Sequence, residues 1–196
     1  MKQRKLEILL EKVAGFDSPN VRLEQYATPA VLAAEVLHFA YMNGDLADTV
    51  YDLGCGTGIL AIGAKLLGAE RVVGFDTAEK ALEIARNNAV KMGVDVEFKC
   101  CDISDINGNA HTVVMNPSFG AQAKGSDSTV ILTALRTSRV TYSIHNCGSH
   151  DFIQKFISPA VITEWYKTSF SMKRTFKFHK KDVEQIEVEI YRIMQQ

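Results

Sequence analysis

The chain has 196 residues, of which 46% are hydrophobic and 23% charged, a size and balance typical of one globular domain with a substantial core. Its formal net charge of −1 argues against a protein that holds nucleic acid through its overall field, because non-specific phosphate binding grows with the number of cationic contacts. No stretch is apolar and long enough for a signal peptide or a membrane span. The four cysteines lack the spacing of a zinc site. We therefore expect a reduced, cytoplasmic protein without a resident metal or membrane contact.

Two helices are expected ahead of the first strand. The first is amphipathic, covers residues 1–14 and ends at Gly15, because glycine accepts the left-handed conformation that closes a helix. Thr28 followed by Pro29 predicts an N-cap and a proline at the first helical position of the second helix, which continues to about Tyr41.

Strands and helices then alternate to the end of the chain, and this alternation predicts an α/β fold with a mostly parallel sheet, helices on both faces and an antiparallel last strand. The seven expected strands are 49–52, 71–75, 96–100, 112–115, 140–144, 161–172 and 186–194. The expected helices between them are 59–67, 78–92, 128–137 and 151–157. A single domain is expected over 1–196, with a helical part at 1–45 and the sheet core at 46–196.

A glycine-rich loop, Asp52-Leu53-Gly54-Cys55-Gly56-Thr57-Gly58, follows the first expected strand. Without side chains at Gly54, Gly56 and Gly58, the backbone can approach a nucleotide-like ligand closely. The dinucleotide-binding pattern requires a glycine where Ile59 stands. The carboxylate of Asp52 would also repel a pyrophosphate and attract a cation, such as the ammonium of a methionine moiety.

Two further acids end the second and third expected strands. Asp76 is placed to accept hydrogen bonds from both hydroxyls of a ribose, and Asp102 to accept from the exocyclic amino group of an adenine. Together with Asp52, these positions suit S-adenosylmethionine (AdoMet). The alternative for all three carboxylates is the capping of a helix N-terminus.

The sequence Asn116-Pro117-Ser118-Phe119 follows the fourth expected strand, at the sheet edge where open α/β folds bind ligands. The amino nitrogen of adenine is a poor nucleophile because its lone pair is delocalised into the ring. The side-chain carbonyl of Asn116 and the backbone carbonyl of Pro117 can bind its two hydrogens, and Phe119 can stack on an extruded base. Fixed carbonyl dipoles then stabilise the charge that moves to nitrogen during methyl transfer. The alternative is an ordinary Asn-Pro turn.

These residues resemble the amino methyltransferases whose loop reads Asn/Asp-Pro-Pro-aromatic, and more closely the archaeal and eukaryotic family that methylates adenine N6 in small-subunit ribosomal RNA. The resemblance extends over nearly the whole chain. Besides the two loops it rests on the segments 23–29, 142–145, 179–181 and 186–189.

The resemblance implies a Rossmann-like class I methyltransferase fold with AdoMet as cofactor and RNA as substrate. It also implies that Gln25, Tyr26 and Thr28 wrap the methionine end of the cofactor. Eukaryotic members of the family work with a small zinc-containing activator that pairs along a sheet edge, so one alternative is that this chain is one half of such a heterodimer. His145 is not expected to act as a base, since amino methylation needs none before transfer.

Other functions fit parts of the same pattern. The substrates of a guanine-N2 or a protein glutamine-N5 methyltransferase would present the same kind of planar amino group to the loop. The family's second proline is Ser118 here, so a non-catalytic AdoMet-binding or RNA-binding protein is a further alternative.

The segment 165–181 combines six cations and five aromatic residues with no acid. Such a composition is typical of a nucleic-acid surface, where aromatic rings stack on bases and cations meet phosphates. The alternative is a solvated strand pair whose aromatic residues face the core.

Overall fold

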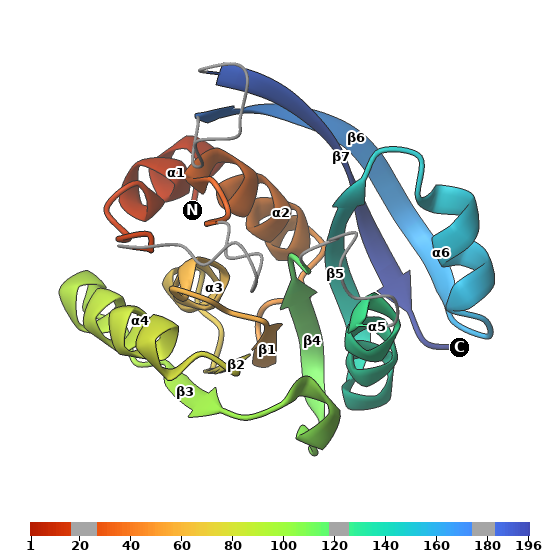
Figure 1. Cartoon of the computed structure of the whole chain (residues 1–196), viewed down its shortest axis with the longest axis horizontal. Coiled ribbons are helices and arrows are strands. Elements are labelled where there is room, and N and C mark those ends of the chain that lie inside the picture. The colour runs from red at the N-terminus through yellow and green to blue at the C-terminus, as the bar shows by residue number, and fades with distance from the viewer. Residues whose placement is uncertain (17–26, 118–125, 174–182) are drawn as a thin grey trace.

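The computed structural model of the chain describes residues 1–16, 27–117, 126–173 and 183–196. Seven strands form one sheet in the order β3-β2-β1-β4-β5-β7-β6 (Figure 1). They are β1 (Thr49–Leu53), β2 (Arg71–Asp76), β3 (Glu97–Cys100), β4 (Ala110–Met115), β5 (Ser138–Asn146), β6 (Val161–Lys173) and β7 (Val183–Met194). The pairings from β3 to β5 are parallel, whereas β7 is antiparallel to both β5 and β6. The expected α/β sheet with an antiparallel last strand is confirmed.

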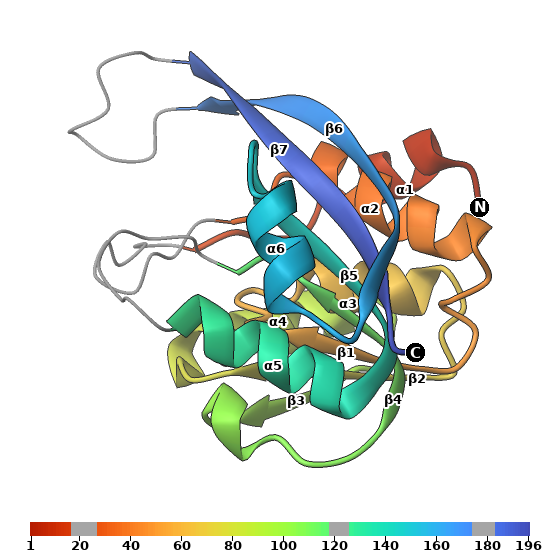
Figure 2. The ribbon, with the colours of Figure 1, turned by 90° about the vertical axis from the view of Figure 1, so that its right-hand side faces the viewer.

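Helices cover both faces of this sheet. One face carries α1 (Gln3–Leu10), α2 (Ala30–Met42), α3 (Ile59–Leu66) and α4 (Glu79–Met92). The other carries the short 3-10 helix η2 (Ile103–Asp105) together with α5 (Ser126–Thr137) and α6 (His150–Phe156). Figure 2 shows α5 and α6 on one side of the strands and α1 and α2 on the other. The molecule therefore has three layers, helix, sheet and helix.

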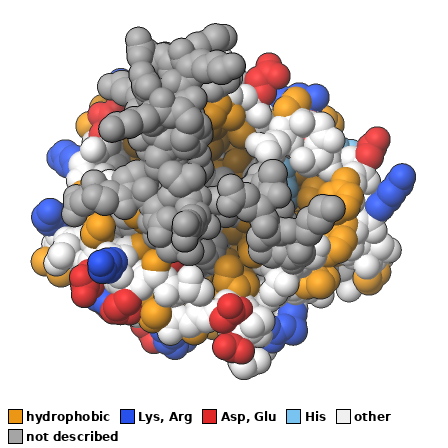
Figure 3. Space-filling view, viewed as in Figure 1, with side chains coloured by type: hydrophobic (Ala, Val, Ile, Leu, Met, Phe, Trp, Pro, Cys, Tyr) orange, Lys and Arg blue, Asp and Glu red, His pale blue; other side chains and the backbone are white. Residues whose placement is uncertain are grey.

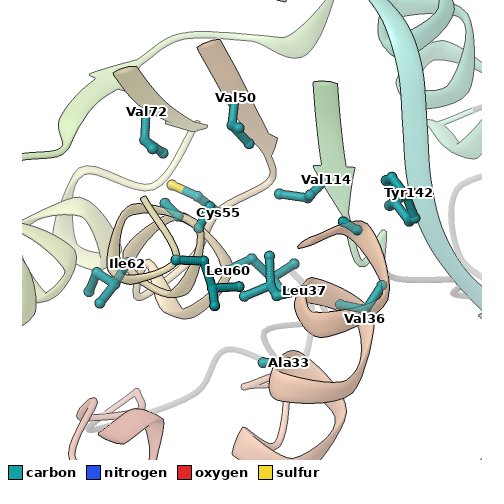
Figure 4. Close-up of a cluster of buried hydrophobic side chains, with 14 of the residues drawn as sticks. Ala33, Val36, Leu37, Val50, Cys55, Leu60, Ile62, Val72, Val114 and Tyr142 are labelled. Carbon is teal, nitrogen blue, oxygen red and sulfur yellow. The ribbon is translucent and has the colours of Figure 1, made fainter. Parts of the chain in front are cut away.

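The alternation of side chains along β1 separates the two cores. Val50 points into the cluster formed with α2 and α3, whereas Tyr51 and Leu53 point into the cluster formed with α5 and α6. Figure 4 shows the first cluster, with Leu37 of α2 and Leu60 of α3 packed between the helices and the strands. Because both cores are built on the same strands, the sheet holds the two helical layers in one unit.

The N-terminal helices differ from the sequence-based expectation in two details. Helix α1 ends at Leu10, and the chain continues through tighter turns in which Lys12 and Val13 donate to the carbonyls three residues before them. Pro29, in extended conformation, takes the N-cap position of α2 that was expected for Thr28. The hydroxyl of Thr28 instead accepts a hydrogen bond from the side chain of Asn116.

Strands β6 and β7 extend past the carboxyl end of β5 (Figure 2). The last residue of β5, Asn146, pairs with Val188, so the earlier residues of β7 pair with β6 alone. The hairpin thus projects from the edge of the sheet at which the parallel strands end.

Candidate functional site

The glycine-rich loop and the Asn-Pro loop lie side by side because of the strand order. β1 and β4 are neighbours in the sheet, and their last residues, Leu53 and Met115, are paired. The chain turns one way from β1 to β2 and β3, and the other way from β4 to β5. Open α/β sheets bind ligands at this kind of reversal, outside the carboxyl ends of the strands. The topology therefore brings Gly54 and Asn116 to the same place.

The glycine loop is held in a left-handed conformation at each glycine. The φ angles of Gly54, Gly56 and Gly58 are +70°, +51° and +86°, a backbone conformation that residues other than glycine rarely adopt. The amides of Gly54 and Cys55 both donate to the carbonyl of Phe75, each at 2.9 Å. A Cβ atom at Gly58 would lie 3.0 Å from the ring of Phe98. The loop is thus fixed by its own backbone and closely packed underneath.

Asp52 lies beneath this loop, and its carboxylate is buried, with 1% of the residue exposed. Its Oδ2 accepts from the amide of Ala61 in α3 at 2.9 Å, and its Oδ1 has no hydrogen-bond partner among the described residues. Burial raises the pKa of Asp52 to about 7. A cationic group close to this carboxylate would favour its ionised form.

Asp76 links the second strand to the glycine loop. Its Oδ2 accepts from the amide of Gly56 and its Oδ1 from that of Ala78, both at 2.8 Å. Each carboxylate oxygen has a second lone pair, so both can also accept from a ligand hydroxyl. The carboxylate lies at the carboxyl end of β2, next to the loop, as expected for a ribose contact.

Asp102 is exposed and caps the 3-10 helix η2. Its Oδ1 accepts from the amide of Ser104 at 2.8 Å and from the hydroxyl of Ser104 at 2.6 Å. The hydroxyl and amide of Ser104 lower the pKa of this carboxyl. The helix-capping alternative is thus realised here, while the exposed carboxylate stays available as an acceptor.

Asn116 is joined to the start of α2 by a hydrogen bond across 88 positions of the chain. Its side-chain nitrogen Nδ2 donates to the hydroxyl oxygen Oγ1 of Thr28 at 2.9 Å. Pro117 follows directly, and both residues are half-buried. A hollow of about 180 Å³ adjoins Thr28 and is lined also by Thr57 of the glycine loop, by Ile59 at the start of α3, and by Gly15 and Ala27.

Asn88 of α4 was not singled out from the sequence. Its side chain is buried and makes three hydrogen bonds, each of 3.0 Å: Oδ1 accepts from the amide of Ala14, and Nδ2 donates to the carbonyls of Ala14 and Thr57. This residue ties the segment after α1 to the glycine loop. One signal in the sequence could have identified Asn88. It is a polar residue on the face of α4 that otherwise carries apolar residues, namely Ala81, Leu82, Ala85 and Ala89.

Four residues of the expected site lie outside the described residues. They are Gln25, Tyr26, Ser118 and Phe119. The same holds for the cations at 174, 177, 180 and 181 of the basic segment. Their expected roles remain predictions.

His145, at the end of β5, is buried with 1% of the residue exposed. Burial lowers its pKa to about 3, against an opposing effect of Glu189. Its imidazole is therefore neutral at physiological pH. Its Nε2 lies 2.8 Å from the hydroxyl of Ser143 on the same strand. These contacts are those of a structural side chain in the sheet.

The fold and the site define the class of protein. Residues 32–117 match the family model of ribosomal protein L11 methyltransferase (PrmA). The match begins in α2 and ends at Pro117, so it includes the glycine loop and the first four strands but less than half of the chain. A solved structure similar over the full length is that of the candidate RNA methyltransferase PH1948 from Pyrococcus horikoshii, with a TM-score of 0.92 and 38% identity over 100% of this chain and 98% of that one. The chain has the Rossmann-like fold of class I methyltransferases.

Relatives along the whole chain identify the family. The chain is 39% identical to the uncharacterized protein MJ0284 of Methanocaldococcus jannaschii, covering 98% of this chain and 94% of that protein. It is 35% identical to the rRNA N(6)-adenosine-methyltransferase Mettl5 of Drosophila melanogaster, covering 98% of this chain and 96% of that protein. The chain belongs to the rRNA N(6)-adenosine-methyltransferase family, as its resemblance in the two loops predicted.

No helix within the described parts of the chain is both long and apolar enough to cross a membrane.

Proposed function

We propose that this protein transfers the methyl group of AdoMet to the N6 amino group of an adenine in RNA, with small-subunit ribosomal RNA as the substrate. The observation that carries this proposal is the adjacency of Asn116-Pro117 to the glycine loop at the reversal between β1 and β4. Relatives that share the whole chain, rather than the first four strands alone, are named as rRNA adenosine methyltransferases.

The residues around the glycine loop fit AdoMet. Asp52 has a buried oxygen without a partner among the described residues, and its pKa is raised. A nearby ammonium group would donate a hydrogen bond to this oxygen and lower the pKa. Asp76 offers two carboxylate oxygens beside the loop for ribose hydroxyls, and Asp102 an exposed acceptor for an adenine amino group. Gln25, Tyr26 and Thr28 complete the expected set at the methionine end. When bound, AdoMet supplies an electrophilic methyl group on a sulfonium.

Asn116 and Pro117 supply the chemistry on the substrate side. Their two carbonyl oxygens hold the hydrogens of the target amino group and favour a pyramidal nitrogen with its lone pair directed at the methyl group. The same carbonyl dipoles stabilise the positive charge that arises on nitrogen. Phe119 holds the extruded base by stacking. No general base is needed before transfer, and His145 would be a weak one, because burial lowers its pKa to about 3.

The β6–β7 hairpin is the proposed RNA surface. Its described aromatic residues divide between two faces: Tyr166 and Phe170 pack on the core with α2, whereas Trp165 is 43% exposed with the Lys167 ammonium 5.9 Å from its ring centre. On the face drawn in Figure 3, cationic and anionic side chains of the described residues are interspersed. RNA binding should therefore depend on the local cations of the segment 165–181 rather than on a general positive field.

Three further expectations belong to this proposal. The protein works in the cytoplasm, pairs with a small zinc-containing activator along a sheet edge, and folds as one domain over 1–196. Strand β3 and strand β6 are the two edges of the sheet.

Transfer of labelled methyl from AdoMet to small-subunit RNA lacking the modification tests the proposal, with nucleoside analysis of the product. N6-methyladenosine that disappears in Asn116→Ala supports it. Labelled guanosine would instead favour the guanine-N2 alternative, and label in protein, in a parallel assay that contains protein substrates, would favour the glutamine-N5 alternative. AdoMet binding without any transfer, with the activator added, would favour the non-catalytic role suggested by Ser118.

The contribution of the hairpin is tested by neutralising Lys173, Arg174 and Lys177 together. The triple variant should bind RNA more weakly and with a flatter dependence on salt. Unchanged binding would remove the segment from the RNA interface.

A further inference from the structure

The hydrogen bond between Asn116 and Thr28 bears on how the site selects the orientation of the Asn116 amide. A planar amide has a carbonyl end and an amino end of nearly the same shape. Only the carbonyl end can accept a hydrogen from the target amino group. With the amino end there instead, two donors would face each other and the target hydrogen would have no acceptor. The side chain is productive in one of its two orientations.

Thr28 holds that productive orientation in the structure. Nδ2 donates to the Thr28 hydroxyl oxygen at 2.9 Å, which turns the carbonyl oxygen Oδ1 away from α2. The sequence predicts Thr28 as the N-cap of α2, but Pro29 takes that position and α2 has no side-chain cap hydrogen bond. The hydroxyl oxygen of Thr28 accepts from Asn116 instead.

A hydroxyl can both donate and accept, so its own proton decides which end of the amide it binds. If the proton pointed at Asn116, the carbonyl end would be drawn to Thr28 and the site would be in the unproductive orientation. A proton committed to another acceptor leaves only lone pairs for Asn116, and these bind Nδ2. Thr28 also lines the hollow that Thr57 of the glycine loop borders, and under the proposed function Thr28 contacts the methionine end of AdoMet, which carries a carboxylate.

We propose that Thr28 is a positioning residue that couples cofactor binding to the orientation of the catalytic Asn116. Its hydroxyl proton is donated to the methionine end of AdoMet, and its oxygen then accepts from Nδ2 and directs Oδ1 to the target amino group. The inference rests on the proposed function. It goes beyond a role for Thr28 as a cofactor ligand alone, because a ligand need not act through Asn116.

Steady-state kinetics of Thr28→Val and Thr28→Ser test this role. Valine keeps the shape of threonine and removes the hydroxyl, so Thr28→Val should lower kcat roughly 10-fold, which corresponds to the loss of about one hydrogen bond. Thr28→Ser keeps the hydroxyl and should stay within about twofold of the wild type. A rise in the Kd for AdoMet with unchanged kcat would reduce Thr28 to a cofactor ligand and overturn the proposal.

The same change in an Asn116→Asp background separates positioning from any direct effect. A carboxylate presents an acceptor oxygen at both ends, so it has no wrong orientation. The cost of Thr28→Val in kcat should therefore shrink to less than about threefold when residue 116 is aspartate. An equal cost in both backgrounds would show that Thr28 does not act through the amide of Asn116.

A third readout does not depend on transfer. The side-chain amide resonances of Asn116, assigned by their loss in Asn116→Asp, should shift on AdoMet binding in the wild type and in Thr28→Ser but not in Thr28→Val. A shift of the same size in Thr28→Val would overturn the coupling. Absence of RNA methylation by the wild type, with its activator present, would instead count against the proposed function, and these resonances would still report on Thr28.

Discussion

At the scale of single residues, the buried carboxylate of Asp52 lowers the stability of the protein without ligand and is proposed to bind the cationic end of AdoMet. Only Oδ2 is hydrogen-bonded among the described residues, and burial raises the pKa to about 7. Because this pKa lies above the value of 3.8 expected in an unfolded chain, the native state holds a proton that the unfolded state has already released. The stability of the protein without ligand should therefore fall as the pH rises from about 4 through about 7.

Asp52→Asn removes this titration. The variant should have a Tm that hardly changes between pH 6 and pH 8, where the Tm of the wild type falls, because the amide stays neutral. It should also bind AdoMet roughly 10-fold more weakly at pH 7.5, since the cation loses its partner. Thermal melts and calorimetric titrations at several pH values measure both. A parallel fall of Tm in the two proteins would show that another group is responsible.

Asn88 offers a matched pair with its exposed neighbour Asn87. Asn88→Ala should destabilise the protein by about 1–3 kcal/mol, because the amide and carbonyl of Ala14 and the carbonyl of Thr57 lose their partner. It should weaken AdoMet binding as well, since Thr57 belongs to the glycine loop. Asn87→Ala, on the same helix, should change neither quantity in denaturant unfolding and binding assays. Equal effects of the two changes would mean that helix propensity, rather than the tie to the loop, was measured.

At the scale of elements, the two ends of α3 carry glycines in similar backbone conformations but different surroundings. Gly58 is the N-cap with φ +86°, and a Cβ there would lie 3.0 Å from Phe98 and 3.1 Å from Ala85. Gly68 follows the helix with φ +104°, and a Cβ there would have no neighbour within 4 Å. A side chain would therefore strain the backbone at both positions, but it would meet neighbouring atoms only at Gly58.

Alanine at each position separates the two effects. Gly68→Ala should cost about 1 kcal/mol in the free energy of unfolding, the price of left-handed backbone, and leave AdoMet binding intact. Gly58→Ala should cost more and should weaken AdoMet binding by more than roughly 10-fold, because the loop must move to accommodate the new atom. Unfolding curves and AdoMet titrations of both variants check this. Similar AdoMet affinities in the two variants would contradict a close-packed glycine loop.

The apolar pattern of the sequence was sufficient to predict the helices and strands. Every helix and strand expected from the apolar pattern is present, and most ends agree within about three residues because glycines and polar residues mark them. α1 is shorter than its amphipathic pattern, since its last residues turn toward α4, where Asn88 binds Ala14. That contact joins positions 74 apart in the chain, and no local pattern encodes it.

At the scale of the whole molecule, both cores share the strands of one sheet, which supports the proposal of one domain. Trp165 is the single tryptophan and lies on β6, the edge strand farthest from β3. Its fluorescence reports on the hairpin, whereas far-ultraviolet circular dichroism reports mainly on the helices. The two denaturant unfolding curves should coincide, because the helical layers cannot persist once the shared sheet is lost. A fluorescence transition at lower denaturant would mean that the hairpin unfolds on its own.

The sequence by itself determined the alternation of strands and helices, the glycine loop, the Asn-Pro loop and the family, since these depend on residues close together in the chain. The tertiary structure decided which distant residues meet. The strand order places Asn116 beside the glycine loop, and the approach of α2 gives its amide a partner in Thr28. Such contacts follow from the packing of helices on a sheet, where side chains far apart in sequence come within hydrogen-bonding distance, and residue spacing carries no record of that distance.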